Sequence, residues 1–495
     1  MKITTWLTSL CSALTLTAAS PALAQTPPPA KPDSIDLFIR ARMQQLRIPG
    51  LQLAVVHHGN IVKLGHYGLA NVQDSVPVDR TTLFPINSIT KAFVGVAVMQ
   101  LVEAGKLDVA APVGRYLPEL PAAWRGITVR QLLTHTSGLP DILPEGVQVT
   151  ADDQLTAWKA VQAQPLESQP GEKFSYNQTN YLLVGKLIDQ LSGQPFTRFI
   201  EDRQLRVAGL PRTTFADANS VVPHSTRGYT YFYAVDGELR RTAELHNMFE
   251  VFAPMLRTAA GLNSTAEEMA TWVLALQQGK LLQPASLPTL WTPGKLTNGT
   301  ERGFSKQLNG YALGWPTITR PEHRAVAPVG GGRSAVFLYP DDDLAVVVLT
   351  NLTGANPDRF VDELASFYVP DMRLATGFGL PPTLRRLHHE LRRRGFDHAL
   401  ALVRQQQKQN PGYQLPESEV NAWGYSLLRQ QQPREALEIF KLNVSLYPKS
   451  ANAYDSLAET YQELGNKTLA VKNYQQVLRL DPHSKNAAQQ LQRLH

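Results

Sequence analysis

The sequence predicts an α+β domain followed by an all-α domain of helical repeats. Two segments with alternating apolar residues, 51–68 and 335–352, each contain a turn signal, and mainly helical segments lie between them. Strands at both ends of a domain that enclose helices in chain order are expected to share one sheet. A period of 34 residues between 417 and 495 predicts the helical repeats.

The first 24 residues have the features of an export signal. Lys2 supplies a positive start, a mostly apolar stretch follows, and Ala22-Leu23-Ala24 provides the small residues that signal peptidase prefers. We expect cleavage after Ala24 and a periplasmic or secreted protein. An uncleaved membrane anchor is the alternative, but Thr and Ser residues and Pro21 interrupt the segment. No stable membrane span is expected once the signal is removed, because no later stretch is long and apolar enough.

Length and composition exclude several classes of protein. The chain has 495 residues, 43% hydrophobic and 18% charged, which predicts two or three globular domains. A net charge of +6 is modest for this length and predicts no nucleic-acid partner. The single cysteine, Cys11, lies inside the signal, so the mature chain has no disulfide and no thiol nucleophile.

We expect neither a metal nor a cofactor. The run HHELRRR (388–394) resembles a zinc-binding motif, but Arg393 stands where the second His is needed. The sequence also lacks a phosphate-binding loop and a dinucleotide fingerprint.

The elements of the first domain are expected over residues 34–368. A Pro-rich linker, residues 25–33, leads to a helix from about Ser34 to Arg47. The first hairpin turns at His58-Gly59-Asn60, and the second has an acidic turn at Asp341–Asp343. The Gly- and Pro-containing stretch 369–382 is predicted to be the linker to the repeats.

Residues 383–495 are predicted to form tetratricopeptide-like helical hairpins. Small, aromatic and proline residues recur 34 positions apart, at Ala436 and Ala470, Phe440 and Tyr474, Pro448 and Pro482, and Gly424 and Ala458. The stretch 383–410 is expected to be a degenerate helical pair joined at Gly395, which brings the array to about three units. Its seven basic residues against two acidic ones indicate either a solvated face or a site for an anionic partner. Stacked repeats usually leave a groove, so we expect this domain to bind a protein partner.

Ser88 and Lys91 stand one turn apart at the start of an apolar helix, in the stretch LFPINSITKAFVGVAV (83–98). At this spacing the two side chains lie on one helix face, about 5–6 Å apart at Cβ. Serine needs a neighbouring proton acceptor to act as a nucleophile. Desolvation would lower the pKa of Lys91 and let it share in proton transfer. The pattern therefore indicates acyl-enzyme chemistry, and a helix-cap Ser beside a solvated Lys is the structural alternative.

Three further motifs follow in order. They are ITVRQLLTHTSGLPD (127–141), PGEKFSYNQTNYLLVGKLI (170–188) and YALGW (311–315). With S-x-x-K at 88–91, they make residues 34–365 resemble the serine β-lactamase and penicillin-binding-protein-like family, in its class C and esterase branch. The resemblance implies a five-stranded antiparallel sheet flanked by helices, with the active site beside a helical lobe. It also implies Ser88 as the acylated nucleophile, Lys91 as its partner and Tyr176 as general base. We interpret His135 as a structural residue that holds a loop.

The sequence departs from the family pattern at two places. Gln178 stands where the third residue of the tyrosine motif is Asn, and we expect its amide to contact substrate and Lys91. The family's basic–hydroxyl–Gly triad corresponds to Pro328-Val329-Gly330, so both functional side chains are absent. His323, Arg324 or Arg333 could supply charge instead. Gly330 is expected beside the substrate, and the N–H of Gly331 is expected to complete an oxyanion hole with that of Ser88.

These departures favour an exported esterase or peptidase that acts on a small ester or peptide-like substrate. Penicillins and D-alanyl peptides carry a carboxylate, for which the usual anchor is missing. A catalytically degenerate binding protein that works through its repeats is the first alternative. A true β-lactamase or D-alanyl carboxypeptidase is the second.

Overall fold

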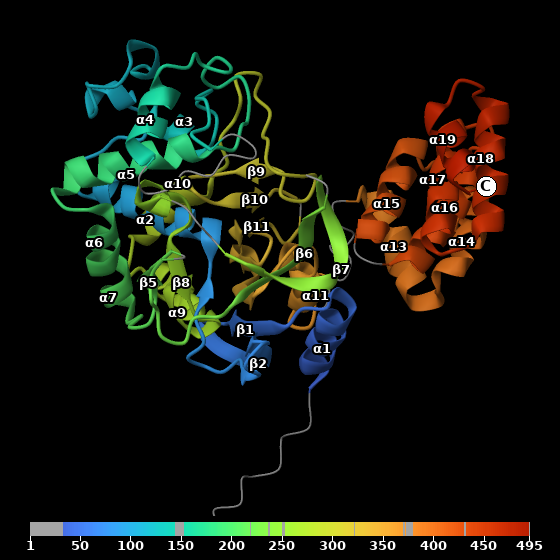
Figure 1. The fold of residues 1–495 in the computed structure, drawn as a ribbon, viewed down its shortest axis with the longest axis horizontal. Helices are drawn as coiled ribbons and strands as arrows, with labels where there is room; N and C mark the ends of the chain where they lie inside the picture. Colours follow the sequence, from blue (N-terminus) through green and yellow to red (C-terminus); the bar gives the residue numbers. More distant parts are fainter. Residues whose placement is uncertain are drawn as a thin grey trace, which may run out of the picture.

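The computed structural model describes residues 33–143, 153–217, 219–235, 238–249, 253–320, 322–369, 372, 380–429 and 432–494. It contains a larger domain of sheet and helices (residues 33–369 and 372) and an all-helical repeat domain (residues 380–494), which stand side by side (Figure 1). The predicted signal, residues 1–24, and nearly all of the predicted linker 25–33 lie outside the described residues. No helix in the described ranges has both the length and the apolar character needed to cross a membrane.

One antiparallel sheet forms the centre of the larger domain, in the order β3-β2-β1-β14-β13-β11-β10-β9, with β12 also paired to β13. Its long strands are β1 (Gly50–His57), β2 (Asn60–Asn71), β13 (Ser334–Tyr339) and β14 (Leu344–Thr350). Both predicted hairpins are therefore confirmed. The two hairpins are joined by antiparallel pairing of β1 with β14, which runs from Leu51 opposite Thr350 to His57 opposite Leu344.

The sheet has nine strands in the described residues, whereas the resemblance implied five. Besides the four long strands, it contains five short segments of two or three residues, namely β3 (Val76–Pro77), β9 (Gly310–Tyr311), β10 (Pro316–Ile318), β11 (Ala325–Val326) and β12 (Val329–Gly330). The α+β class and the β-lactamase-like arrangement of sheet and helices are confirmed.

Alternation along β1 builds an apolar layer on each face of the sheet. Leu51, Leu53 and Val55 pack with α1 (Ser34–Leu46) and α11 (Val361–Ala365). Ala54 and Val56 pack on the opposite face, with α2 (Thr90–Glu103) and α9 (Ala266–Gln277). The capping box formed by Asp33 and Asp36 sets the start of α1, and Arg47, with φ of 56°, ends it.

A helical lobe covers the far side of α2, at the upper left of Figure 1. It contains α3 (Val129–Leu133), α4 (Gln154–Gln162), α5 (Gln178–Ser192), α6 (Phe196–Ile200) and α7 (Arg206–Ala208), and α10 (Leu287–Trp291) lies near it. As a result α2 is surrounded by protein, and every residue from Thr90 to Leu101 is buried.

Two three-stranded sheets complete the larger domain. One has the order β15 (Leu352–Thr353), β6 (Gly228–Val235) and β7 (Glu238–Met248). The other has the order β4 (Phe84–Pro85), β8 (Leu262–Ser264) and β5 (Thr214–Phe215). The short helix α8 (Arg257–Ala260) precedes β8. Because β4 directly precedes Ser88, this second sheet helps to place that residue.

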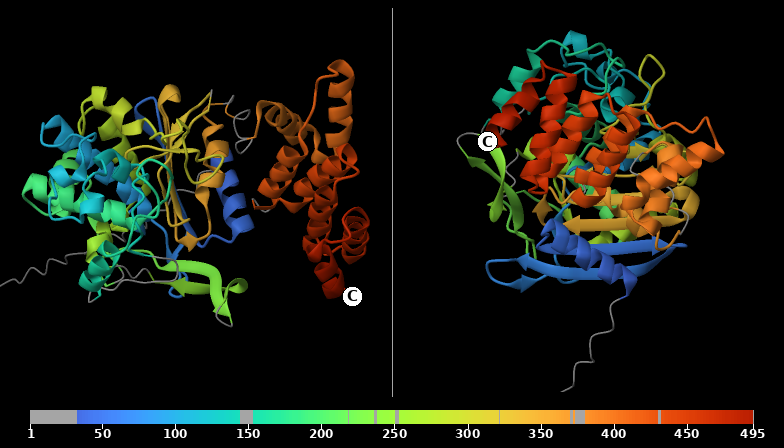
Figure 2. Two further views of the ribbon diagram at one scale, coloured as in Figure 1. Left: turned by 90° about the horizontal axis from the view of Figure 1, so that it is seen from above. Right: turned by 90° about the vertical axis from the view of Figure 1, so that its right-hand side faces the viewer.

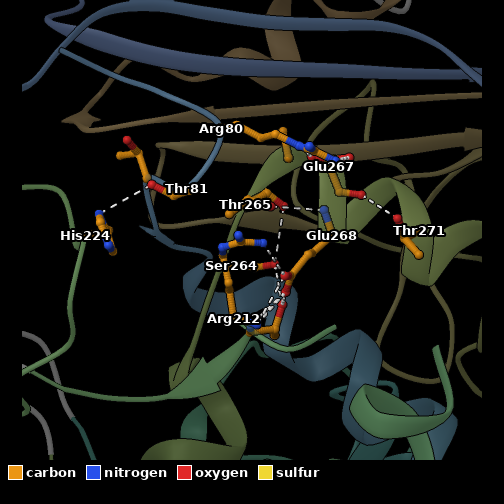
Figure 3. Close-up of polar contacts among 12 residues, drawn as sticks. Arg80, Thr81, Arg212, His224, Ser264, Thr265, Glu267, Glu268 and Thr271 are labelled. Atoms are coloured by element: carbon orange, nitrogen blue, oxygen red, sulfur yellow. Dashed lines mark hydrogen bonds and ion pairs between the residues drawn. The ribbon is translucent and has the colours of Figure 1, made fainter. Parts of the chain in front are cut away.

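Polar contacts at the start of α9 hold β8 in place (Figure 3). Thr265 caps α9 by accepting a hydrogen bond from the N–H of Glu268 at 3.0 Å. The Glu268 carboxylate accepts bonds from the hydroxyl and the N–H of Thr213, both at 2.7 Å. An ion pair between Arg80 and Glu267 ties the chain before β4 to the same helix end. We interpret the cluster as structural, because its members form hydrogen bonds and an ion pair with one another.

The repeat domain has seven helices in the described residues: α13 (Pro382–Arg394), α14 (Ala399–Gln409), α15 (Glu417–Arg429), α16 (Pro433–Leu446), α17 (Ala451–Glu463), α18 (Lys467–Leu480) and α19 (Lys485–Leu494). Figure 2 shows them as a stack beside the larger domain. The repeat pattern is confirmed. Gly424 leaves room for the ring of Phe440, and Pro448 and Pro482 follow the ends of α16 and α18. Gly395, with φ of 100°, joins α13 to α14 as expected.

The two domains have separate apolar cores. Met372 is buried in the core of the larger domain, and Leu380 belongs to the core of the repeats. Most of the predicted linker, residues 369–382, lies outside the described residues. An ion pair of 2.7 Å joins Glu363 of α11 to Arg392 of α13. Because Arg392 is 43% exposed, this contact contributes little to stability.

Gly95 permits the close packing of α2, and its substitution tests that packing. A Cβ on Gly95 would overlap the carbonyl oxygen of Leu313, whereas one on Gly126 would meet no atom within 4 Å. We expect Gly95→Ala to destabilise the larger domain by about 1–3 kcal/mol. Gly126→Ala should change its stability by less than about 0.5 kcal/mol. Urea unfolding of both variants measures the difference, and equal midpoints would contradict this account of α2.

Candidate active site

Ser88 lies in a single turn of 3₁₀ helix, Asn87–Ile89, between β4 and α2. The side chain of Thr90 accepts a hydrogen bond from the N–H of Leu262 at 3.1 Å, which links this turn to β8. Lys91 follows in the first turn of α2 and has no exposed surface. The structure thus places the two residues together, as their spacing predicts.

The amine of Lys91 is surrounded by three oxygen atoms from three segments. Its Nζ lies 2.9 Å from the carbonyl oxygen of Ala259, 3.1 Å from Oε1 of Gln178 and 3.4 Å from Oγ of Ser88. Burial disfavours the ammonium form and lowers the pKa of Lys91 to about 7, while the charge of Asp141 partly opposes this shift. The amine can therefore exchange a proton near neutral pH.

Tyr176 contacts Ser88 from the opposite side. It precedes α5, and its hydroxyl donates to Oγ of Ser88 at 2.9 Å. Burial raises the pKa of Tyr176 above its ordinary value, although the hydrogen bond to Ser88 lowers it. The Nζ of Lys91 lies 4.8 Å from the centre of the ring. Burial therefore favours the neutral phenol over the phenolate that a general base would need.

The start of α5 brings Gln178 to Lys91. Asn177 caps this helix by accepting from the N–H of Asn180, and Gln178 begins it. Despite its extra methylene, the amide oxygen of Gln178 reaches the amine of Lys91. The N–H of Gln178 donates to Oδ1 of Asp141 at 2.9 Å. Burial raises the pKa of Asp141, while the hydrogen bonds from Gln178 and Leu143 lower it. The sequence analysis had not singled out Asp141, although it ends the quoted motif 127–141.

His135 is placed as a structural residue. It is fully buried, and its Nδ1 lies 3.3 Å from the N–H of Asn177 and 3.1 Å from Nδ2 of Asn180. Its carbonyl accepts from the N–H of Ser175. Burial lowers the pKa of His135 well below its ordinary value. The residue thus holds the Tyr176 loop as a neutral ring.

Gly330, at the end of β12, and Gly331, which follows it, lie against the nucleophile turn. A Cβ on Gly330 would overlap the carbonyl oxygen of Ile86, and one on Gly331 would lie 3.0 Å from Cγ of Asn87. Gly331 also has φ of 56°, in the region that favours glycine. The structure therefore brings the backbone at 330–331 beside the residues that precede Ser88.

Of the three basic residues considered as substitutes for the missing triad, the structure brings one to the site. His323 pairs with Asp342, and Arg324 pairs with Asp341, in both cases away from Ser88. Arg333 is 2% exposed, and its Nη2 donates to Oδ1 of Asn87 at 3.1 Å. Asn87, which has φ of 49°, was not among the predicted site residues.

Aromatic side chains and a cavity border the site. The ring of Phe304, 42% exposed, meets that of Tyr176 edge-on with 4.9 Å between centres. A cavity of about 480 Å³ opens beside the nucleophile turn. Its lining includes Pro85, Gly228, Ala260, Asn263 and Arg333.

The sequence of the larger domain matches a family model. The model described as Beta-lactamase matches residues 35–369, which is more than half of the chain. The chain belongs to the β-lactamase family. A second model, described as Tetratricopeptide repeat, matches residues 453–484 of the repeat domain.

Proteins similar to this β-lactamase family member include Protein flp of Staphylococcus aureus strain MW2. It is 28% identical over 350 residues, which cover 69% of this chain and 67% of that protein. The D-amino acid amidase of Ochrobactrum anthropi has a similar structure, with a TM-score of 0.56, 21% identity, and coverage of 67% of this chain and 99% of that one. EstCE1, a hydrolase with promiscuous acyltransferase activity, gives a TM-score of 0.53, 22% identity, and coverage of 65% and 93%. The two structural likenesses show the fold.

Proposed function

We propose that this protein is an exported serine hydrolase that forms an acyl-enzyme on Ser88. The observation that carries the proposal is the position of the Ser88 hydroxyl, 2.9 Å from the phenol of Tyr176 and 3.4 Å from the amine of Lys91. Membership of the β-lactamase family supports it. Export rests on the predicted signal at residues 1–24.

The surroundings of Lys91 favour its role as proton acceptor. Two of its three partners, the carbonyl of Ala259 and the amide oxygen of Gln178, can only accept hydrogen bonds. They take the two N–H groups of a neutral amine, which leaves the nitrogen lone pair for the proton of Ser88. Tyr176, held as a phenol, donates to the same oxygen and keeps it directed.

In the proposed reaction, Oγ of Ser88 forms a bond to the substrate carbonyl carbon as its proton passes to Lys91. The carbonyl electrons move to the oxygen, which the N–H groups of Ser88 and Gly331 would hold. Collapse of this intermediate breaks the bond to the leaving group, which takes the proton back from Lys91. Water then attacks the acyl carbon as its proton passes to Lys91. The bond from this carbon to Oγ of Ser88 breaks, Oγ takes the proton back from Lys91, and the acid is released.

We propose a small ester or a peptide-like amide as substrate. Pro328 and Val329 provide neither the charge nor the hydroxyl that the family uses to hold a substrate carboxylate. The names of two structural neighbours, an amidase and a hydrolase with acyltransferase activity, are compatible with this class. β-Lactamase or D-alanyl carboxypeptidase activity remains the alternative, and turnover of nitrocefin or release of D-alanine would favour it.

Ser88→Ala tests the proposed nucleophile. We expect this variant to lose labelling by a fluorophosphonate and to lower kcat on p-nitrophenyl esters by about 10⁴-fold or more, because the attacking oxygen is gone. Mass mapping should place the adduct of the native protein on Ser88. Ser192→Ala, at the far end of α5, is the matched control and should keep full activity. An unlabelled Ser88 in the native protein would contradict the proposal.

We further propose that the repeat domain recruits a protein partner and takes no part in the chemistry. Among the described residues, its apolar core is built from side chains of positions 380–494. A degenerate binding protein is the second candidate function, favoured by the absence of the basic and hydroxyl side chains at 328–329. Under that function, partner binding would survive Ser88→Ala and be lost with residues 383–495.

Residues 34–372, expressed alone, should fold and retain the kcat/KM of the full chain on a small ester within about 2-fold. The expectation follows from the separate cores and from the exposed, weak ion pair between Glu363 and Arg392. The comparison requires both proteins to show cooperative thermal unfolding. A folded fragment without activity would show that the repeats contribute to the site.

A further inference from the structure

Asn87, which directly precedes the nucleophile, has a left-handed backbone conformation. Its φ is 49°, a region that residues other than glycine seldom adopt, although Asn tolerates it better than most. The side chain is only 7% exposed. The direction of the following peptide, and with it the positions of the Ser88 hydroxyl and N–H, depends on this conformation.

The hairpin of β12 and β13 contacts Pro85, Ile86 and Asn87, the three residues before Ser88. Gly330 packs against the carbonyl of Ile86 so closely that no side chain would fit. Ser334 donates to the carbonyl of Pro85 at 3.4 Å. Between them, the guanidinium of Arg333 donates to Oδ1 of Asn87 at 3.1 Å.

Arg333 is itself held firmly by the central sheet. Its carbonyl accepts from both the N–H and the hydroxyl of Thr350, each at 2.9 Å, and its own N–H donates to Gly330. With 2% of its surface exposed, its side chain has little freedom to move. The sheet therefore sets the position from which the guanidinium reaches Asn87.

We propose that Arg333 is a positioning residue that holds Asn87 in its left-handed conformation and thereby directs Ser88 toward Lys91 and Tyr176. The inference rests on the proposed function for its catalytic consequence. Arg333 orders the nucleophile turn from the side where Pro328 and Val329 offer no polar side chain.

Four substitutions, two of which are also combined in a double variant, test this role. Arg333→Gln should lower kcat by about 10²-fold, with KM changed less than about 2-fold, because a misplaced nucleophile slows the chemistry. Arg333→Lys keeps a donor and should recover part of the loss. Asn87→Gly adopts a positive φ without strain, so adding Arg333→Gln to it should cost less than about 5-fold. Arg324→Gln removes an exposed guanidinium that pairs with Asp341 away from Ser88, and it should leave kcat unchanged.

Crystal structures of the native protein and of Arg333→Gln separate this inference from the proposed function. We expect residue 87 to leave the left-handed region in the variant and Oγ of Ser88 to move away from the Tyr176 hydroxyl. An unmoved turn would overturn the inference, whether or not the native protein hydrolyses esters. A moved turn in a protein that never acylates would refute the proposed function alone. A raised KM with unchanged kcat would show that Arg333 binds substrate instead.

Discussion

The arrangement of the larger domain depends on the burial of one amine, that of Lys91. The residue sits on a helix enclosed by the sheet, α9 and the helical lobe, and none of its surface reaches solvent. A buried amine needs polar partners, and it finds them in Ala259 of α8, Gln178 of α5 and Ser88. Segments distant in the sequence thus converge on this nitrogen.

The other polar groups of the site position the side chains that contact the buried amine. His135 and Asn177 fix the loop of Tyr176 and the start of α5, so the phenol and the Gln178 amide arrive from one rigid unit. The β12–β13 turn fixes the nucleophile from the other side. The repeat domain builds its own core. Reaction chemistry and partner recognition can therefore reside on different parts of the chain.

The hairpins, the helical repeats and the pairing of Ser88 with Lys91 could be predicted because each leaves a local pattern: alternation, a 34-residue period and an i, i+3 spacing. Tyr176 and Gln178 could be placed from a motif. The protonation state of Tyr176 could not, because it depends on burial by residues far away in the sequence. Arg333 was one of three possible cations, and only the pairing of β13 with β14 shows which of them reaches Asn87. The short strands that widen the sheet are likewise set by tertiary contacts.

The central claim is that burial makes Lys91 a neutral base that accepts the Ser88 proton. The pH dependence of the second-order rate of Ser88 labelling by a fluorophosphonate tests it most directly. Because the unprotonated amine is the active form, the rate should rise with pH and level off, with an apparent pKa of about 7. In Asp141→Asn the rise should move to lower pH, because the charge that favours the ammonium is removed. A rate that is constant from about pH 5.5 to 9, or that rises only near the ordinary pKa of lysine or tyrosine, about 10, would contradict the account.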